Sequence, residues 1–308
     1  MEKKNDLKVG IESGIFDNFA LSCFRNCPEY YHKRIGQGVV KPGAKKTAAD
    51  FGTGIHMALE NYYKQGMTDS AVQESFDLFT KYFRDHEDMA DDKRTLGKGL
   101  EILVKYFDKY RREPFNVVAT EVGGALELSN DILYSFRIDL VVEWQTPKGI
   151  YGMDHKTTSS MNRMIGKPNN QMTGYEWALR QYYQDVIGWM VNCIGVYKSD
   201  KTRDKNTGKM VERDIFLRIP TSRTRKEIDQ WVSETLQLVK MIEYCTTTKT
   251  FPKHSPEFCT SYATKCQYID LCSAQDSEQI LSALLDTGTY EIDWWRPYEE
   301  VGEEVDEI

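Results

Sequence analysis

The sequence predicts an α/β fold, of the α+β kind, in which helices flank a central mixed β-sheet. Three observations predict it. Residues 16–111 place apolar side chains at helical spacing, residues 115–156 alternate apolar and polar side chains as strands do, and the two periods alternate again after residue 171. Gly, Asn, Asp and Pro gather between these segments, as turns require. The sequence therefore predicts a helical insertion that precedes the sheet.

Four helices are expected in the first third of the chain. The first covers Phe16–Lys33, and the second opens near Ala48. The third follows Thr68, a residue type that caps helix N-termini, and the fourth spans Leu96–Arg111. The fourth helix ends before a proline, because the residue that precedes proline disfavours the helical conformation.

Strands are expected in the middle of the chain, and helices and strands alternate after them. The four expected strands are Phe115–Glu121, Ala125–Leu128, Ile132–Trp144 and Ile150–Lys156. The elements expected after them are a helix from Gln171 to about Asn192, a strand near Ile194–Tyr197, a hairpin turn at Asn206–Gly208, a strand at Asp214–Ile219 and a helix from Ser222 to about Tyr244.

The length of 308 residues suits one large domain or two modest ones, and the sequence has neither internal repeats nor a low-complexity linker. We therefore expect a single domain over residues 1–275. Its parts are a helical subdomain at about 57–113, a catalytic core at about 114–245 and a cysteine-bearing segment at 251–275. An acidic tail, residues 276–308, follows and is expected to be disordered.

Several features favour a cytoplasmic protein without a membrane partner. The longest apolar stretch that lacks charge, Val186–Tyr197, is too short to cross a bilayer. The first ten residues are charged and lack the apolar core of a signal peptide. The seven cysteines are an odd number, which favours a reducing compartment over a disulfide scaffold.

Charge is unevenly distributed along the chain. The formal net charge is −7, but residues 286–308 contain nine acidic residues and one basic residue, so the rest carries +1. Residues 198–226 contain ten Lys or Arg and four Asp or Glu. This basic segment could bind a polyanion, and the acidic tail could compete for it. A charge run is more often only a solvated face.

Two carboxylates and a lysine are expected to meet on neighbouring strands. Strict alternation along Ile132–Trp144 places Asp139 on the face opposite the apolar stripe, and alternation in the next strand sends Asp154 and Lys156 to one side. His155 then points away and offers its backbone carbonyl. Hard oxygen ligands and a lysine suit a phosphodiesterase that uses Mg²⁺ or Mn²⁺. The alternative is a surface hairpin with salt-bridged charges.

The order of the motifs is typical of one nuclease family. The chain contains Gly52-Thr53-Gly54-Ile55-His56, then Glu121, Asp139, Asp154-His155-Lys156 and Gln171-Met172-Thr173-Gly174-Tyr175. In this order and over residues 16–272, it resembles the RecB-like branch of the PD-(D/E)XK nuclease superfamily. The resemblance implies a restriction-endonuclease-like sheet. One departure is the doublet Asp-x-Lys, where Glu-x-Lys is commoner, although both supply a carboxylate.

The resemblance also implies roles for these residues. His56, Asp139, Asp154 and the carbonyl of His155 would bind the metal, and Lys156 would be the catalytic lysine. Glu121 would bind a second metal or hold water. Gln171 and Tyr175, one helical turn apart, would brace the lysine or touch the DNA backbone. Simple packing of His56 or Tyr175 and plain exposure of Glu121 are the alternatives.

Three cysteines lie close together near the end of the expected domain. Cys259, Cys266 and Cys272 are separated by six and five residues, and in a reducing compartment a thiolate-bound metal explains such a group. With Cys27 or Cys23 near the N-terminus, the pattern resembles the iron–sulfur subgroup of RecB-like nucleases, which includes CRISPR-associated members. That resemblance implies a structural 4Fe–4S cluster with Cys27 as its fourth ligand. The first gap is wider than usual, and Zn²⁺ or free buried thiols are the alternatives.

The function that these patterns predict is a metal-dependent DNA nuclease. An exonuclease acting on single strands or duplex ends in recombination, replication or repair is expected, and its stand-alone size resembles that of nucleases encoded by phages. Its partners would be DNA and recombination or replication proteins. The alternatives are a catalytically idle DNA-binding or scaffold subunit, and a metal-containing protein whose acidic tail recruits a partner.

Overall fold

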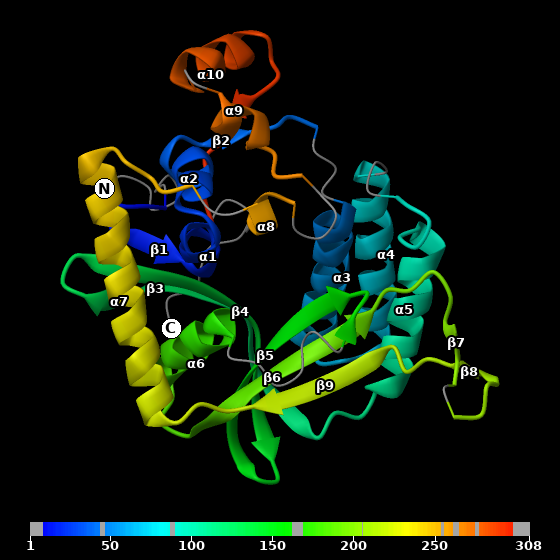
Figure 1. Cartoon of the computed structure of the whole chain (residues 1–308). Helices are drawn as coiled ribbons and strands as arrows, with labels where there is room; N and C mark the ends of the chain where they lie inside the picture. The colour runs from blue at the N-terminus through cyan, green and yellow to red at the C-terminus, as the bar shows by residue number, and fades with distance from the viewer. Residues whose placement is uncertain are drawn as a thin grey trace. The chain divides into compact units, whose positions relative to one another are not determined.

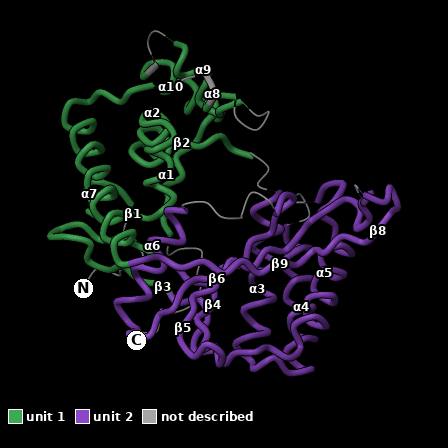
Figure 2. The backbone as a smooth tube through the Cα atoms, turned by 60° about the horizontal axis from the view of Figure 1, so that its bottom comes forward, with its two compact units in different colours: residues 1–44, 123–136, 225–308 green, residues 45–122, 137–224 purple. Residues whose placement is uncertain are grey.

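The structure, a computed structural model, describes residues 9–43, 47–86, 90–161, 169–204, 206–253, 256–260, 265–274 and 277–297. The chain forms two compact units, each of which is discontinuous in sequence (Figure 2). Unit 1 consists of residues 1–44, 123–136 and 225–308, and unit 2 consists of residues 45–122 and 137–224. The expected α/β architecture with a central mixed sheet and flanking helices is confirmed.

Three helices of unit 2 form the helical insertion that the sequence predicts. They are α3 (Thr47–Lys64), α4 (Asp69–Asp85) and α5 (Leu96–Lys109), and they stand side by side in Figure 1. Thr68 and Thr95 cap α4 and α5, since each hydroxyl accepts a hydrogen bond from a backbone N–H in the first turn. Their apolar faces bury Ile55, Phe79 and other side chains in the main core cluster of this unit.

The strands pair in a mixed sheet. Their bounds are β1 (Ile15–Asp17), β3 (Phe115–Ser129), β4 (Ile132–Gln145), β5 (Lys148–Thr158), β6 (Val186–Gly195) and β9 (Phe216–Thr221). The pairing order is β1-β4-β5-β6-β9, and β3 also pairs with β4. Strand β4 is parallel to β1 and antiparallel to β5, while β6 is parallel to β5 and antiparallel to β9.

Helix α6 (Asn170–Tyr182) connects the parallel strands β5 and β6. In unit 2 it covers one face of the sheet, where the ring of Tyr175 lies 5.6 Å from that of Trp189. Met153 and Met190 point to the opposite face and join the core that the three insertion helices build. The sheet of unit 2 therefore lies between α6 and the helical insertion (Figure 1).

Two expectations for the middle of the chain are wrong. The helix expected from Gln171 to about Asn192 ends at Tyr182, and Val186–Gly195 is strand β6. A strand buried on both faces is continuously apolar, so its periodicity cannot be told from that of a buried helix. The two strands expected at Phe115–Glu121 and Ala125–Leu128 are the single strand β3, which passes through the glycines between them.

The short elements of unit 1 also differ from expectation. The helix expected over Phe16–Lys33 is β1 followed by α1 (Asn18–Asn26), α2 (Pro28–Tyr31) and a π-helical turn η2 (His32–Gly36). The break falls at Cys27, whose extended backbone (φ −163°, ψ 113°) is the conformation that a following proline favours. The long helix expected after Ser222 is confirmed as α7 (Arg225–Thr248).

The expectation of a disordered acidic tail is wrong for its described part. Residues 277–297 contain α10 (Ser277–Asp286) and β10 (Glu291–Ile292), which pairs antiparallel with β2 (Val39–Val40). Arg34 donates a 2.7 Å hydrogen bond to the carbonyl of Asp293, and the Trp295 indole donates one of 2.7 Å to Asp17. The remaining tail, residues 298–308, lies outside the described residues.

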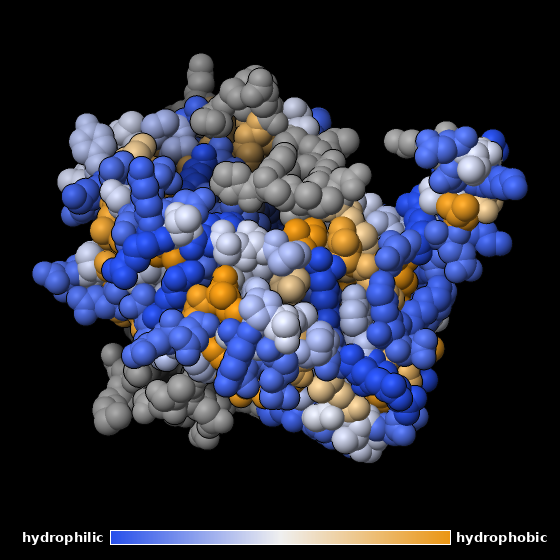
Figure 3. Space-filling view, turned by 90° about the horizontal axis from the view of Figure 1, so that it is seen from below, coloured by the Kyte–Doolittle hydropathy of each residue, from blue (hydrophilic) through white to orange (hydrophobic). Residues whose placement is uncertain are grey.

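The described residues contain no helix that combines the length and the apolar character needed to cross a membrane. Figure 3 shows one face of the molecule on which hydrophilic side chains predominate and apolar ones form small scattered groups.

Candidate active site

The carboxylates of Asp139 and Asp154 are brought together by the antiparallel pairing of β4 and β5. Leu140 pairs with Met153, so the register continues towards Asp139 on one strand and Asp154 on the other. Asp139 Oδ2 accepts a 2.7 Å hydrogen bond from the backbone N–H of His155. Asp139 is 9% exposed and Asp154 is 2% exposed. The structure thus places two buried carboxylates at adjoining positions of the sheet.

Lys156 lies beside Asp154, two residues along the same strand and on the same face. Its ammonium donates a 3.0 Å hydrogen bond to Asp154 Oδ1 and lies 2.9 Å from Oδ2. Although burial opposes the charge of Lys156, the carboxylates of Asp154 and Asp139 raise its pKa, so the lysine is an ammonium. Among the described residues, Asp154 Oδ2 accepts no hydrogen bond and is shielded from solvent. Oδ2 therefore contacts the Lys156 ammonium as an ion pair, and its remaining lone pair can bind a second cation.

His56 reaches this site from α3. Its Nδ1 lies 3.4 Å from Asp139 Oδ2, and its ring lies 5.8 Å from that of His155, edge to face. Burial, and then the charge of Lys156, lower the pKa of His56 to about 4, while a hydrogen bond with the backbone of His155 opposes that shift. The imidazole is therefore neutral near pH 7, which is the form that can bind a metal.

Glu121 approaches the two aspartates from β3, where its φ of 48° lies in the left-handed region. It forms an ion pair with Arg137, whose Nε lies 3.4 Å from Glu121 Oε2. Burial and then the charge of Asp139 raise the pKa of Glu121. Burial likewise raises the pKa of Asp139, and it raises the pKa of Asp154 to about 6. Burial therefore disfavours the charged form of all three carboxylates, and a bound cation would favour it.

Gln171 and Tyr175 lie one turn apart on α6, where the Gln171 amide donates a 3.0 Å hydrogen bond to the Tyr175 hydroxyl. Burial, and then the carboxylate of Asp154, raise the pKa of Tyr175 to about 12. The Tyr175 hydroxyl also contributes to the raised pKa of Lys156. Tyr175 is therefore near enough to Lys156 to affect its pKa, and the roles of Gln171 and Tyr175 stay a prediction.

The chemistry of these donors fits a hard divalent cation. Two carboxylates and a backbone carbonyl are the kinds of ligand that Mg²⁺ and Mn²⁺ prefer, and Mg²⁺ commonly takes its remaining ligands from water and substrate phosphate. Within the described ranges, however, no three His, Cys, Asp or Glu side chains are grouped as a ready-made metal site. A metal here would depend on the carbonyl of His155 or on substrate for part of its coordination.

The four cysteines expected to bind a cluster all lie in described parts of unit 1. Cys27 ends α1, Cys259 ends α8 (Pro256–Cys259), Cys266 precedes α9 (Ile269–Ser273) and Cys272 lies within α9. Cys266 donates a 2.7 Å backbone hydrogen bond to Cys259. None of the seven cysteines forms a disulfide.

Electrostatics indicate which of these thiols are neighbours. Burial, and then the thiols of Cys259 and Cys27, raise the pKa of Cys266. Burial, then Glu29 and Cys266, raise the pKa of Cys272 to about 11, and Cys27 adds to that shift. Cys23 differs, because burial and Asp17 raise its pKa to about 12. Cys27 therefore contributes to the raised pKa values of Cys266 and Cys272, whereas the pKa of Cys23 responds to burial and to Asp17.

The basic segment, residues 198–226, is less available than its composition indicates. Arg218 is buried against Glu113, Lys198 forms a 3.1 Å ion pair with Asp92, and Arg213 lies 4.6 Å from the ring of Tyr197. The hairpin turn expected at Asn206–Gly208 is confirmed between β7 (Lys201–Arg203) and β8 (Met210–Glu212). Exposed bases for DNA are left on this hairpin, at Lys201, Arg203 and Lys209.

Two residues near the site were not identified from the sequence. Arg137 follows the same alternation as Asp139, two residues before it on β4, and that spacing could have indicated it. Asn192 is a fully buried polar residue of strand β6, whose other side chains are mostly apolar. A lone amide in such a strand is a signal only once the segment is identified as a strand.

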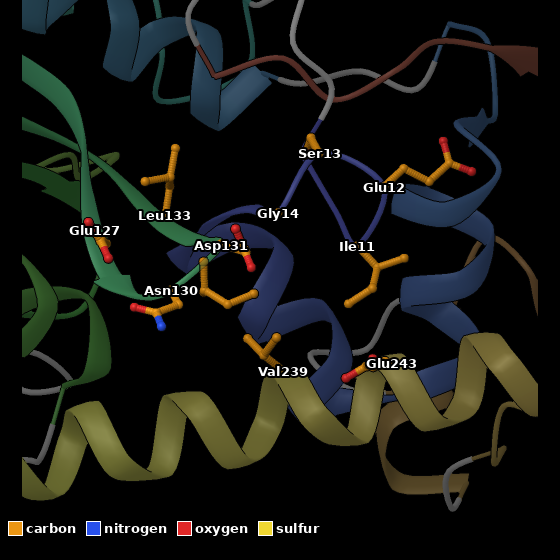
Figure 4. Close-up of a pocket in the computed structure, with 11 residues that line it drawn as sticks. Ile11, Glu12, Ser13, Gly14, Glu127, Asn130, Asp131, Leu133, Val239 and Glu243 are labelled. Atoms are coloured by element: carbon orange, nitrogen blue, oxygen red, sulfur yellow. The ribbon is translucent and has the colours of Figure 1, made fainter.

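A pocket of about 900 Å³ lies in unit 1 (Figure 4). Its lining comes from residues 11–14, the turn between β3 and β4, and α7. The charged side chains that line it are all acidic: Glu12, Glu127, Asp131 and Glu243. Because such a pocket repels phosphate, it is a poor site for nucleic acid.

Comparison with known proteins gives one family. The family model of the PD-(D/E)XK nuclease superfamily matches residues 19–273. Among solved structures, a crystal structure of a candidate exonuclease from Eubacterium rectale is similar, with 13% sequence identity and a TM-score of 0.46. That similarity covers 85% of this chain and 94% of the other. No curated protein matches the chain.

Proposed function

The chain belongs to the PD-(D/E)XK nuclease superfamily, and from this premise we propose that it is a deoxyribonuclease that hydrolyses phosphodiester bonds with Mg²⁺ or Mn²⁺. The observation that carries the proposal is the joining of Asp139, Asp154 and Lys156 on one face of two paired strands, within hydrogen-bond distance of one another or of the intervening peptide. The burial of both carboxylates, 9% and 2% exposed, supports a cation at this place.

Each residue has a distinct task in the proposed reaction. Asp139, Asp154, the carbonyl of His155 and neutral His56 hold the metal, which when bound polarises the phosphate and lowers the pKa of water. Lys156, kept protonated by Asp154, orients the attacking water and stabilises charge that develops on the phosphate oxygens. Gln171 and Tyr175 hold the lysine in place from α6. Glu121 supplies a further carboxylate for water or a second metal, and Arg137 balances its charge.

A catalytically idle DNA-binding or scaffold subunit is the second candidate. A catalytically idle relative is expected to have lost a metal ligand or the lysine. This chain retains Asp139, which binds the His155 N–H, and Asp154, which binds Lys156. The motif order favours an exonuclease for recombination, replication or repair and a phage origin, and these finer assignments belong to the proposal as well.

The test is digestion of DNA labelled at one end, single-stranded and duplex, with Mg²⁺, Mn²⁺ or EDTA. The proposal expects metal-dependent cleavage that stops in EDTA. An exonuclease releases short products from the first time points, whereas an endonuclease produces a ladder of long ones. DNA that is bound yet intact with either metal would support the idle subunit.

We further propose that Cys27, Cys259, Cys266 and Cys272 hold a structural 4Fe–4S cluster, with Zn²⁺ as the alternative. The mutual effects of these thiols on their pKa values support the set and favour Cys27 over Cys23. In protein purified without oxygen, Cys27→Ser should lose iron and acid-labile sulfide, while Cys245→Ser, a buried thiol on α7, should keep both. Stoichiometric zinc without sulfide would instead establish the alternative.

A further inference from the structure

The peptide of His155 is held from two directions. Its N–H donates to Asp139 on the catalytic face, as described above. The His155 ring points to the opposite face of the sheet, and the whole residue is only 3% exposed. The ring lies parallel to that of Tyr63, with 5.9 Å between the ring centroids. What fixes this ring also fixes the backbone that lies between Asp154 and Lys156.

A row of three polar residues crosses three neighbouring strands at this level. His155 on β5 pairs with Asn192 on β6, and Asn192 pairs with Arg218 on β9. The Asn192 amide nitrogen lies 2.7 Å from His155 Nδ1 and 2.7 Å from the Tyr106 hydroxyl. Its oxygen accepts a 3.4 Å hydrogen bond from Arg218. Because the amide nitrogen can only donate, His155 Nδ1 is the acceptor and its proton resides on Nε2.

The far end of the row is anchored by a buried ion pair. Arg218 binds Glu113 with two hydrogen bonds of 2.7 and 2.6 Å, and the Glu113 side chain is 1% exposed. The hydroxyls of Tyr106 and Tyr63 lie 2.8 Å apart, and Tyr63 donates 2.7 Å to Glu113. Each hydroxyl in this path can donate to the next acceptor, so the network has one consistent direction from Asn192 to Glu113.

Burying these polar groups in an apolar core lowers stability unless each of them is hydrogen-bonded. Asn192 is fully buried, and its neighbours Met190 and Ile194 on the same face belong to the main apolar cluster. Apolar side chains of similar volume would fill this space with equal or greater stability, whereas a network with every group satisfied fixes one arrangement. The only residue of the catalytic set that the network touches by hydrogen bond, within the described residues, is His155.

We propose that Asn192 is a positioning residue, which holds the His155 ring so that the peptide between Asp154 and Lys156 presents its carbonyl to the metal and its N–H to Asp139. The inference rests on the proposed function, because it concerns the same metal site. It adds that metal affinity depends on a residue on the face of the sheet opposite the two carboxylate ligands. Residues that orient metal ligands typically change metal affinity by about 10- to 100-fold when they are replaced.

The test measures Mn²⁺ binding to the free protein by calorimetry, with no DNA present, so that it does not depend on cleavage. Asn192→Leu keeps the approximate volume and removes the hydrogen bond to His155. We expect it to raise the dissociation constant for Mn²⁺ by about 10- to 100-fold. Tyr106→Phe removes one hydrogen-bond partner of Asn192, so it should also raise the dissociation constant for Mn²⁺, but by a smaller factor. This second variant keeps the test available if Asn192→Leu does not fold.

Ile194→Val is the matched control, because Ile194 is fully buried two residues away on the same face of β6. It should lower the melting temperature and leave the Mn²⁺ affinity unchanged. Asp154→Asn locates the site, since it should abolish binding. If Asp154→Asn binds Mn²⁺ as the wild type does, the proposed metal site itself is wrong. If it does not bind but Asn192→Leu binds within twofold of the wild type, or Ile194→Val weakens binding as much, only the role of Asn192 is wrong.

Discussion

The proposed catalytic region of unit 2 and the region of unit 1 where residues 17–34 meet residues 293–295 are built from contacts of different range. At the catalytic site, Asp139, Asp154 and Lys156 lie on consecutive paired strands, so strand register alone brings them together. In unit 1, Asp17 bonds Trp295 and Arg34 bonds Asp293, contacts that join residues more than 250 positions apart. The first region is specified locally, whereas the second forms only when both ends of the chain have met.

This difference has an energetic consequence. The carboxylates of Asp139, Asp154 and Glu121 are buried next to one another, and burial raises the pKa of each. The proposed catalytic region therefore contains buried carboxylates whose charge is unfavourable for stability, as is common at functional sites. The contacts in unit 1 instead satisfy buried groups, and we expect their loss to change stability before anything else.

The largest effect should come from breaking the catalytic region. We expect Asp154→Asn to reduce metal-dependent cleavage by about 10³-fold or more, because it removes a metal ligand and the partner of Lys156. The melting temperature should change less than on loss of the partner of Arg218, because burial disfavours the Asp154 charge and the Lys156 side chain, 30% exposed, stays partly solvated. Cleavage of end-labelled DNA and thermal unfolding measure the two effects.

Glu143→Gln provides the control for this experiment. Glu143 lies on β4 at the same alternation as Asp139, forms a 3.6 Å ion pair with Lys148, and lies at a more exposed position. It should keep nearly full activity. Cleavage by Asp154→Asn at a rate similar to that of Glu143→Gln would contradict the assignment of the site.

A second, smaller effect concerns the buried ion pair of unit 2. Glu113→Gln leaves Arg218 as a buried charge without its carboxylate, and we expect it to lower the free energy of unfolding by about 3–5 kcal/mol. The double substitution Glu113→Gln with Arg218→Met should cost less than the two single substitutions added together, since the partners are lost as a pair. Urea unfolding followed by circular dichroism measures all three; strict additivity would show that the pair is not coupled.

What the sequence could predict follows the same division by range. Alternation along residues 132–144 predicts the face of Asp139, and alternation in the next strand places Asp154 with Lys156, because both depend only on local strand geometry. Helical spacing likewise predicts that Gln171 and Tyr175 meet. The fold class follows from the same periods.

The remaining features depend on pairing between distant segments. Val186–Gly195 is a strand because β5 and β9 flank it, which its uniformly apolar sequence cannot show. The part of the acidic tail that the structure describes is ordered because β10 finds β2 and Trp295 finds Asp17. The importance of Asn192 likewise appears only when the strand register places it beside His155.

The smallest predicted effect tests the long-range contacts of unit 1. Trp295→Phe removes the N–H that donates 2.7 Å to Asp17, which also caps α1 by accepting from Ala20. Hydrogen bonds to charged groups contribute about 1.5–3 kcal/mol, so we expect a loss of about that size in the free energy of unfolding near pH 7. Chemical unfolding measures this loss. It is followed by circular dichroism, because removal of Trp295 changes the tryptophan fluorescence of the protein.

The pH dependence of this loss shows whether Asp17 is responsible for it. Burial raises the pKa of Asp17 above 3.8, while the Trp295 hydrogen bond opposes that rise. A carboxyl whose folded pKa is raised stabilises the fold when it is protonated and loses that contribution as the pH rises through the folded pKa. Trp295→Phe raises the folded pKa further, so its deficit should be full at neutral pH and shrink as the pH falls through the folded pKa values of the variant and of the wild type, both of which lie above the ordinary value of 3.8. In an Asp17→Asn background the deficit should no longer depend on pH, and an equal deficit at both pH values in the native background would show that packing of the indole, not its hydrogen bond, joins the two chain ends.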